Sequence, residues 1–221
     1  MSDIHTGVFL KPAVLAEIVS LLMKVHPDLV AIAGDVVTGK ATDLDGFLPA
    51  LAPLSQAPLG AWFCLGNHDY FGGDPKDIRE ALRSIGISTL CNESVVIANG
   101  QGKFVLGGLD DRIFGRPDWS RLVAEHGPPH LLLAHHPDFF YEAAAGGTPL
   151  TLSGHTHGGQ IRLPNGPPLV RHSQFCLDEG AYLYGSSMLI VSRGLGSVGL
   201  PWRYGADPEA VLIEIIPPQV S

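Results

Sequence analysis

Four short apolar runs in this chain each end in a loop that carries histidine, aspartate or asparagine. The runs are LVAIAGD (29–35), GAWFCLGNHD (60–69), HLLLAHHPD (130–138) and TPLTLSGHTH (148–157). Apolar runs of this length, closed by Gly, Asn or Asp, predict buried β-strands. In α/β sheets, ligands bind beyond the carboxyl ends of the strands. We therefore expect the four polar loops to meet in one site at the strand ends.

Segments with helical spacing of apolar residues separate these strands. They are predicted as helices near residues 14–25, 44–51, 74–85, 118–126 and from 139 onward. Further strands are predicted at 87–97, at 104–107 and over most of the last third, including SSMLIVSRG (186–194) and EAVLIEII (209–216). Strands that alternate with helices indicate a layered α/β fold.

The composition limits the class of protein. A chain of 221 residues with 45% hydrophobic and 16% charged residues fits one domain, 1–221, with a large core rather than a disordered chain. The net charge of −8 and the absence of Lys- or Arg-rich stretches argue against strong binding to nucleic acid or to an anionic membrane. An anionic substrate would need bound metal cations to reverse the local field.

The three cysteines, Cys64, Cys91 and Cys176, fit neither a disulfide framework nor a cysteine-type zinc site. No apolar run is long enough to span a membrane, and no signal peptide opens the sequence.

The stretch GHTHGGQ (154–160) places two histidines two positions apart between glycines. It can be a polar surface loop or part of a metal site, since neutral imidazole is a common ligand of divalent cations. A loop through glycines can turn His155 and His157 toward different metals of one pair, and we expect Gly158 and Gly159 to allow the backbone close to them.

Five motifs in order carry a family resemblance: SDIH (2–5), GD (34–35), GNHD (66–69), AHHPD (134–138) and GHTH (154–157). Together they resemble the calcineurin-like metallophosphoesterase superfamily, over residues 2 to about 216. The C-terminal part resembles a bacterial branch that includes phosphodiesterases and UDP-diacylglucosamine pyrophosphatases. The resemblance implies a four-layer sandwich of two mixed β-sheets flanked by helices, with the metal site at the carboxyl ends of the strands.

The resemblance also implies a centre of two divalent metal ions. Carried over by motif, Asp3, His5 and His157 would hold the first ion, Asn67, His135 and His155 the second, and Asp35 both. Mixed carboxylate, amide and imidazole ligands suit manganese, iron, zinc or nickel, and we favour manganese. A metal-bridging hydroxide would then attack phosphorus.

His68 follows a predicted ligand, so we expect it to protonate the leaving oxygen, with Asp69 orienting it; the alternative is that His68 only supports a ligand. His136 is predicted to line the pocket or support a ligand. Asp110 and Asp111 are predicted to close a strand with a turn. Arg193 can contact a substrate phosphate or form a structural ion pair.

The sequence thus predicts a metal-dependent phosphoester hydrolase acting on small molecules, most consistent with phosphodiesters or pyrophosphate-linked nucleotide sugars. The alternatives are a phosphomonoesterase or protein phosphatase, and an inactive metal-binding relative. The superfamily has an apolar strand ahead of its first motif, whereas Met1 directly precedes SDIH here. We therefore expect a truncated start or a shortened first strand. The sequence fits a cytoplasmic protein as it stands, and an exported or membrane-associated one if the N-terminus is truncated.

Overall fold

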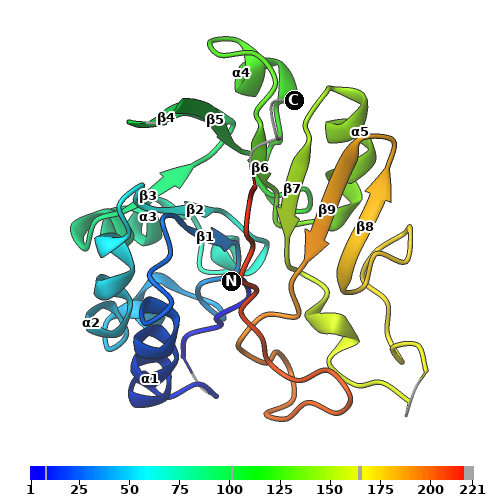
Figure 1. Ribbon diagram of the computed structural model, residues 1–221. Coiled ribbons are helices and arrows are strands. Elements are labelled where there is room, and N and C mark those ends of the chain that lie inside the picture. Colours follow the sequence, from blue (N-terminus) through cyan, green and yellow to red (C-terminus); the bar gives the residue numbers. More distant parts are fainter. Residues whose placement is uncertain (8, 101, 164–165, 217–221) are drawn as a thin grey trace.

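The computed structural model describes residues 1–7, 9–100, 102–163 and 166–216 (Figure 1). Its smaller sheet has the order β1-β2-β3, formed by β1 (Val30–Ala33), β2 (Ala61–Cys64) and β3 (Ile87–Leu90). Its larger sheet has the order β4-β5-β6-β7-β9-β8. These strands are β4 (Glu93–Asn99), β5 (Gly102–Gly108), β6 (Leu131–Leu133), β7 (Leu150–Ser153), β8 (Gly180–Tyr184) and β9 (Ser187–Val191).

Helices cover the outer faces of both sheets (Figure 1). The helices α1 (Pro12–Met23), α2 (Leu48–Leu51) and α3 (Lys76–Ser84) contribute to the core on the outer face of the smaller sheet. The helices α4 (Trp119–Val123) and α5 (Phe140–Ala145) pack on the larger sheet. Short 3-10 turns span Ala41–Leu44, Ala52–Gln56, His68–Tyr70, Pro137–Phe139 and His157–Gly159.

Strand β6 shows how the layers are held together. Its side chains alternate between the two faces of the sheet, as strand geometry requires. Leu131 and Leu133 lie in the apolar cluster between the two sheets, together with Cys64 of β2. Leu132 lies in the cluster formed with α4 and α5. The apolar runs therefore fill two cores, which confirms the predicted α/β fold with two sheets flanked by helices.

The prediction of two mixed sheets holds for the larger sheet but not for the smaller one. The larger sheet is mixed, with antiparallel pairs β4–β5 and β8–β9 at its two ends. The three strands of the smaller sheet pair only in parallel. Helical segments connect these strands, and such crossovers return the chain in the same direction.

Several predicted elements differ from the structure. The strand expected at 87–97 is divided into β3 and β4, and the described part of the last third, expected to be mostly strand, contains only the strands β7, β8 and β9. The expected helix at 44–51 is broken into α2 and two 3-10 turns, because Pro49 and Pro53 start new helical turns rather than continuing one. The predicted strand EAVLIEII (209–216) is wrong, since this segment forms no strand. Leu212, Ile215 and Ile216 are about 70% exposed, at 71%, 69% and 73%. Alternating apolar residues form a strand only where a neighbouring edge accepts their backbone hydrogen bonds.

The carboxyl ends of the central strands lie together. The loops after β1, β2, β6 and β7 carry the polar residues singled out from the sequence. Nδ1 of His135, after β6, lies 2.8 Å from the carbonyl oxygen of Ala33 at the end of β1. This hydrogen bond joins the two sheets beside the predicted site. Among the described residues, no helix has the length and apolar character needed to cross a membrane. The single-domain assignment 1–221 stays a prediction.

Candidate metal centre

The predicted metal ligands come from separate segments and meet in one cluster. Six of them are at least nine-tenths buried, and His155 is partly exposed. The cluster combines the N-terminal segment with the loops after β1, β2, β6 and β7. Its members are Asp3, His5, Asp35, Asn67, His135, His155 and His157.

Asp3, His5 and His157 form one group. Nε2 of His5 lies 3.1 Å from Nε2 of His157. Nε2 of His157 lies 3.5 Å from Oδ1 of Asp3. The ligand atoms of all three residues lie within 4.8 Å of one another, a spacing that lets them share one cation.

Asn67, His135 and His155 form a second group. Oδ1 of Asn67 lies 2.9 Å from Nδ1 of His155 and 3.2 Å from Nε2 of His135. The amide oxygen of Asn67 therefore stands between two imidazoles that come from different strands.

Asp35 lies between the two groups. Its Oδ2 is 3.7 Å from Nε2 of His5 and 3.2 Å from Nε2 of His135. Asp35 also shares one set of closely spaced ligand atoms with Asp3 and His135, and another with His5 and His68. Asp35 thus lies within reach of predicted ligands from both groups.

The electrostatics of the cluster fit bound cations. Burial lowers the pKa of His5 to about 4 and that of His155 to about 2, which keeps both imidazoles in the neutral form that binds metals. Burial raises the pKa of Asp3 to about 6. Nδ1 of His5 is buried and has no hydrogen-bond partner among the described residues. Buried carboxylate oxygens and unprotonated imidazole nitrogens are stabilised by a nearby positive charge.

His135 marks where positive charge is favoured. Burial acts to lower its pKa, but the adjacent Asp35 carboxylate raises it to about 10. A cation between these two side chains would take the place of the imidazole proton. The donor set, with carboxylate, amide and imidazole atoms, fits borderline divalent transition metals.

The backbone of the cluster is unusual. Among the described residues, nine other than glycine have a positive φ, and five of them are predicted ligands. These five are Asp3 (47°), His5 (48°), Asp35 (52°), His155 (70°) and His157 (53°). Each such conformation costs about 1–3 kcal/mol and persists where the surroundings enforce it, which is typical of functional sites.

Glycines let the ligand segments approach one another. A Cβ at Gly154 would overlap Oδ2 of Asp3, and one at Gly34 would overlap the His135 ring. The expectation for Gly158 and Gly159 is wrong, since a Cβ there would meet Arg193 and Pro168 rather than a ligand. Gly34 and Gly154 directly follow β1 and β7, where the segments that carry the predicted ligands lie against one another.

Gly154→Ala is expected to displace Asp3, lower metal content and destabilise the fold by about 1–3 kcal/mol, the usual cost of overpacking. Elemental analysis and thermal unfolding measure both effects. Gly100→Ala is the matched control, since a Cβ there meets no atom of the described residues within 4 Å. Normal metal content in Gly154→Ala would contradict the prediction.

His68 lies at the edge of the cluster, and its orientation comes from Thr38. Nδ1 of His68 lies 2.7 Å from the Thr38 carbonyl oxygen, and the ring centre is 4.7 Å from that of His5. The backbone N–H of His68 donates to Oδ1 of Asp35. His68 is thus fixed between a backbone carbonyl and the predicted ligands.

Asp69 has a different position from the one expected. Its carboxylate does not orient the His68 ring but accepts four backbone N–H groups. Oδ2 accepts from Asp35 and Gly66 at 3.0 and 2.8 Å, and Oδ1 from Val36 and Val37 at 2.9 and 3.3 Å. Asp69 therefore joins the loop after β1 to the loop after β2 and acts on the ligands only through the backbone.

Arg203 contacts the predicted ligand His157, and the sequence did not predict this contact. Its Nη2 lies 3.1 Å from Nδ1 of His157, and its guanidinium donates to the carbonyl oxygens of Arg193, Gly196 and Ala206. It ties the loop at 193–206 to a predicted ligand. Arg203 lies in the C-terminal segment that carries the resemblance to a bacterial branch, but its contact with His157 is visible only in the fold.

The structure also bears on the predicted roles of Arg193 and His136. Arg193 donates to Glu209 at 2.6 Å, which favours the structural ion pair. His136 is buried beside His155, with ring centres 4.2 Å apart, as expected for a residue lining the site.

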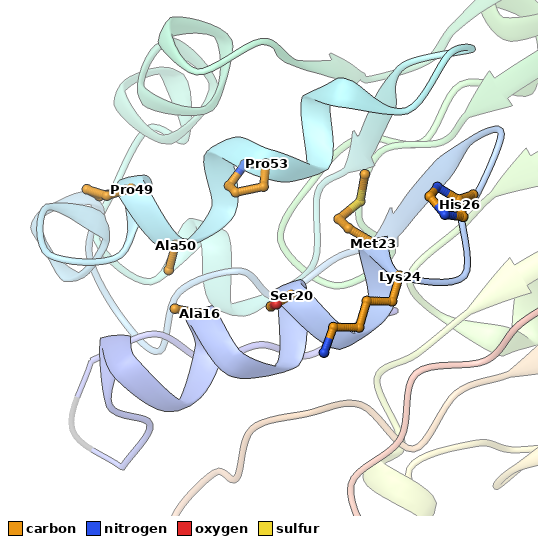
Figure 2. Close-up of a pocket in the computed structure, with 8 residues that line it drawn as sticks. All are labelled: Ala16, Ser20, Met23, Lys24, His26, Pro49, Ala50 and Pro53. Carbon is orange, nitrogen blue, oxygen red and sulfur yellow. The ribbon is translucent and has the colours of Figure 1, made fainter.

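An open groove of about 430 Å³ lies elsewhere, between α1 and the segment 49–53 (Figure 2). None of its eight lining residues is a predicted ligand, and none is a carboxylate.

Comparison with known proteins decides the family. The family model described as calcineurin-like phosphoesterase matches residues 1–159. The chain belongs to the calcineurin-like phosphoesterase family. Phosphodiesterase YaeI of Escherichia coli is 33% identical over 222 residues, which cover 98% of this chain and 80% of that protein. YkuE of Bacillus subtilis, named an uncharacterized metallophosphoesterase, is 31% identical over 221 residues. The matched region covers 97% of this chain and 77% of YkuE.

The solved structures agree on the fold. The NAD nucleotidase of Haemophilus influenzae superposes with a TM-score of 0.54 at 16% identity, over 88% of this chain and 44% of that structure. The chain thus spans less than half of that protein, and the likeness concerns the fold alone. Membership in the calcineurin-like phosphoesterase family confirms the predicted family and enzyme class: the chain is a phosphoester hydrolase of a family that uses divalent metals.

Proposed function

We propose that the chain hydrolyses phosphodiesters, or the pyrophosphate linkage of nucleotide sugars, with two divalent cations, manganese being favoured. In this proposal Asp3, His5 and His157 hold one cation. Asn67, His135 and His155 hold the other, and Asp35 contacts both. The observation that carries it is the position of Asp35, whose Oδ2 lies 3.7 Å from one predicted ligand group, at His5, and 3.2 Å from the other, at His135.

Divalent cations held there would bind the phosphate oxygens and make a water acidic enough to attack phosphorus at neutral pH. His68 supplies the proton for the leaving oxygen. A carbonyl oxygen can only accept, so the 2.7 Å contact with Thr38 places one ring proton of His68 on Nδ1. When the ring is doubly protonated, its second proton is on Nε2, and that is the proton His68 can give to the leaving oxygen.

The preference for diesters rests on similarity. The Escherichia coli relative at 33% identity is named a phosphodiesterase. A screen of manganese-loaded protein with bis(nitrophenyl) phosphate, nitrophenyl phosphate and a nucleotide-diphospho sugar tests it. We expect a higher kcat/KM for the diester or the pyrophosphate than for the monoester.

Two results would contradict the proposal in different ways. Faster hydrolysis of the monoester would indicate a phosphomonoesterase, of which protein phosphatases are one kind. No turnover of any ester, with metal content verified, would indicate an inactive metal-binding relative.

A further inference from the structure

One exposed aromatic side chain lies next to His68, and a second packs against the first. Phe71 and Phe114, called here the aromatic edge, are 51% and 54% exposed. The ring centre of Phe71 is 4.2 Å from that of His68, and Phe114 meets Phe71 edge to face at 5.3 Å. Single exposed apolar residues are common on protein surfaces, but two large rings in contact beside a predicted site indicate a binding surface.

The loop that carries Phe114 is held by a buried carboxylate. Asp111 is 1% exposed, and its Oδ1 accepts the backbone N–H groups of Ile113 and Phe114 at 2.8 and 2.7 Å. Burying a carboxylate is costly unless donors satisfy it. These two N–H groups satisfy Oδ1 of Asp111, whereas its Oδ2 has no hydrogen-bond partner among the described residues. The buried Asp111 carboxylate thus fixes the backbone of a loop whose apolar side chains, Ile113 and Phe114, are exposed.

A second set of contacts fixes this loop to the His68 segment. The Tyr70 hydroxyl donates to Oδ1 of Asp110, and the backbone N–H of Arg116 donates to Oδ2 of Asp110 at 2.8 Å. Asn92 accepts from the backbone N–H of Asp110 and donates to the Arg116 carbonyl. Since Tyr70 directly precedes Phe71, the two rings of the aromatic edge are held in one arrangement.

We propose that the aromatic edge binds an aromatic ring carried on the leaving oxygen of the substrate, and so makes the enzyme prefer aryl-bearing phosphoesters. This inference rests on the proposed function, which places the leaving oxygen at His68. A substituent on that oxygen would lie against the ring that touches His68, which is Phe71. Aromatic rings attract each other in edge-to-face and offset arrangements, so a planar ring gains more here than a saturated one.

The test uses three phosphonates that cannot be hydrolysed at the leaving position: benzyl-, cyclohexylmethyl- and methylphosphonate. In the first two, a CH₂ group replaces the leaving oxygen. Isothermal titration gives their affinities for manganese-loaded protein. We expect benzylphosphonate to bind at least about tenfold more tightly than methylphosphonate, and about two- to tenfold more tightly than cyclohexylmethylphosphonate.

Phe114→Ala and Phe71→Leu should remove most of both preferences and leave methylphosphonate binding unchanged. Phe175→Ala is the matched control, because Phe175 is equally exposed, at 51%, and its ring contacts Tyr141. Preferences that persist in Phe114→Ala and Phe71→Leu would overturn the inference, as would equal affinity of the wild type for the benzyl and cyclohexylmethyl compounds.

These outcomes are distinct from a failure of the proposed function. If wild-type protein binds methylphosphonate and hydrolyses nitrophenyl esters but shows no preference for the benzyl compound, only the role of the aromatic edge is overturned. If it neither binds methylphosphonate nor hydrolyses any ester, both proposals are overturned.

Discussion

Removal of divalent metal ions is expected to abolish hydrolysis, and manganese is expected to restore it. Purified protein should contain about two transition-metal ions per chain, as a centre for phosphoryl displacement requires. The physical reason lies in the cluster itself, where the carboxylates of Asp3 and Asp35 are buried among imidazoles. Divalent cations bound here would counter the charge of a phosphate ester in a protein of net charge −8. Elemental analysis and ester hydrolysis, before and after exhaustive chelation, measure both effects.

Substitution of two ligands tests the assignment to individual ions. Asn67→Ala and His155→Ala remove partners that lie 2.9 Å apart in the second group, so each should lower metal content and cut turnover far more than it lowers stability. His26→Asn is the control, because His26 is exposed, far from any motif, and has a φ of 50° that asparagine tolerates. Full activity after verified metal removal, or normal metal content in either variant, would show that the ligand assignment is wrong.

Four of the seven predicted ligands could be located from the sequence because each closely follows a buried strand. Asp35, Asn67, His135 and His155 come within three residues of the ends of β1, β2, β6 and β7. Parallel strands bring their carboxyl ends to one edge, so an apolar run followed by a polar residue already predicts where that residue lies. The family motifs then predicted how the residues divide into two groups.

The supporting contacts were not accessible in this way. Arg203 reaches His157 across 46 positions, and Tyr70 reaches Asp110 across 40. The sequence around Arg203 and around Tyr70 does not indicate a partner so far away along the chain. The role of Asp69 was mistaken for a similar reason. A carboxylate next to a histidine in sequence suggests a contact, but the 3-10 turn at His68–Tyr70 points Asp69 toward the backbone of 35–37.

His68 is the residue whose role is most sharply testable, because the structure allows two roles for it. Its ligand atom lies within 4.8 Å of those of His5 and Asp35, so it can be close enough to hold a cation. Its contact with Thr38 instead orients Nε2 as a proton donor. A proton donor matters only when the leaving group needs a proton. A metal ligand matters for every substrate, because the cations act before the leaving group departs.

Replacement of His68 by asparagine or alanine should therefore slow trifluoroethyl esters by about 10²–10⁴-fold, the usual contribution of general acid catalysis. Nitrophenyl esters should lose much less, because nitrophenolate leaves without protonation. The comparison of kcat/KM is made at equal metal occupancy, verified by elemental analysis, since the backbone of His68 touches Asp35. Equal losses for both leaving groups, or a loss of bound metal in the His68 variants, would remove His68 from the proton-transfer step and place it among the metal ligands or the residues that support them.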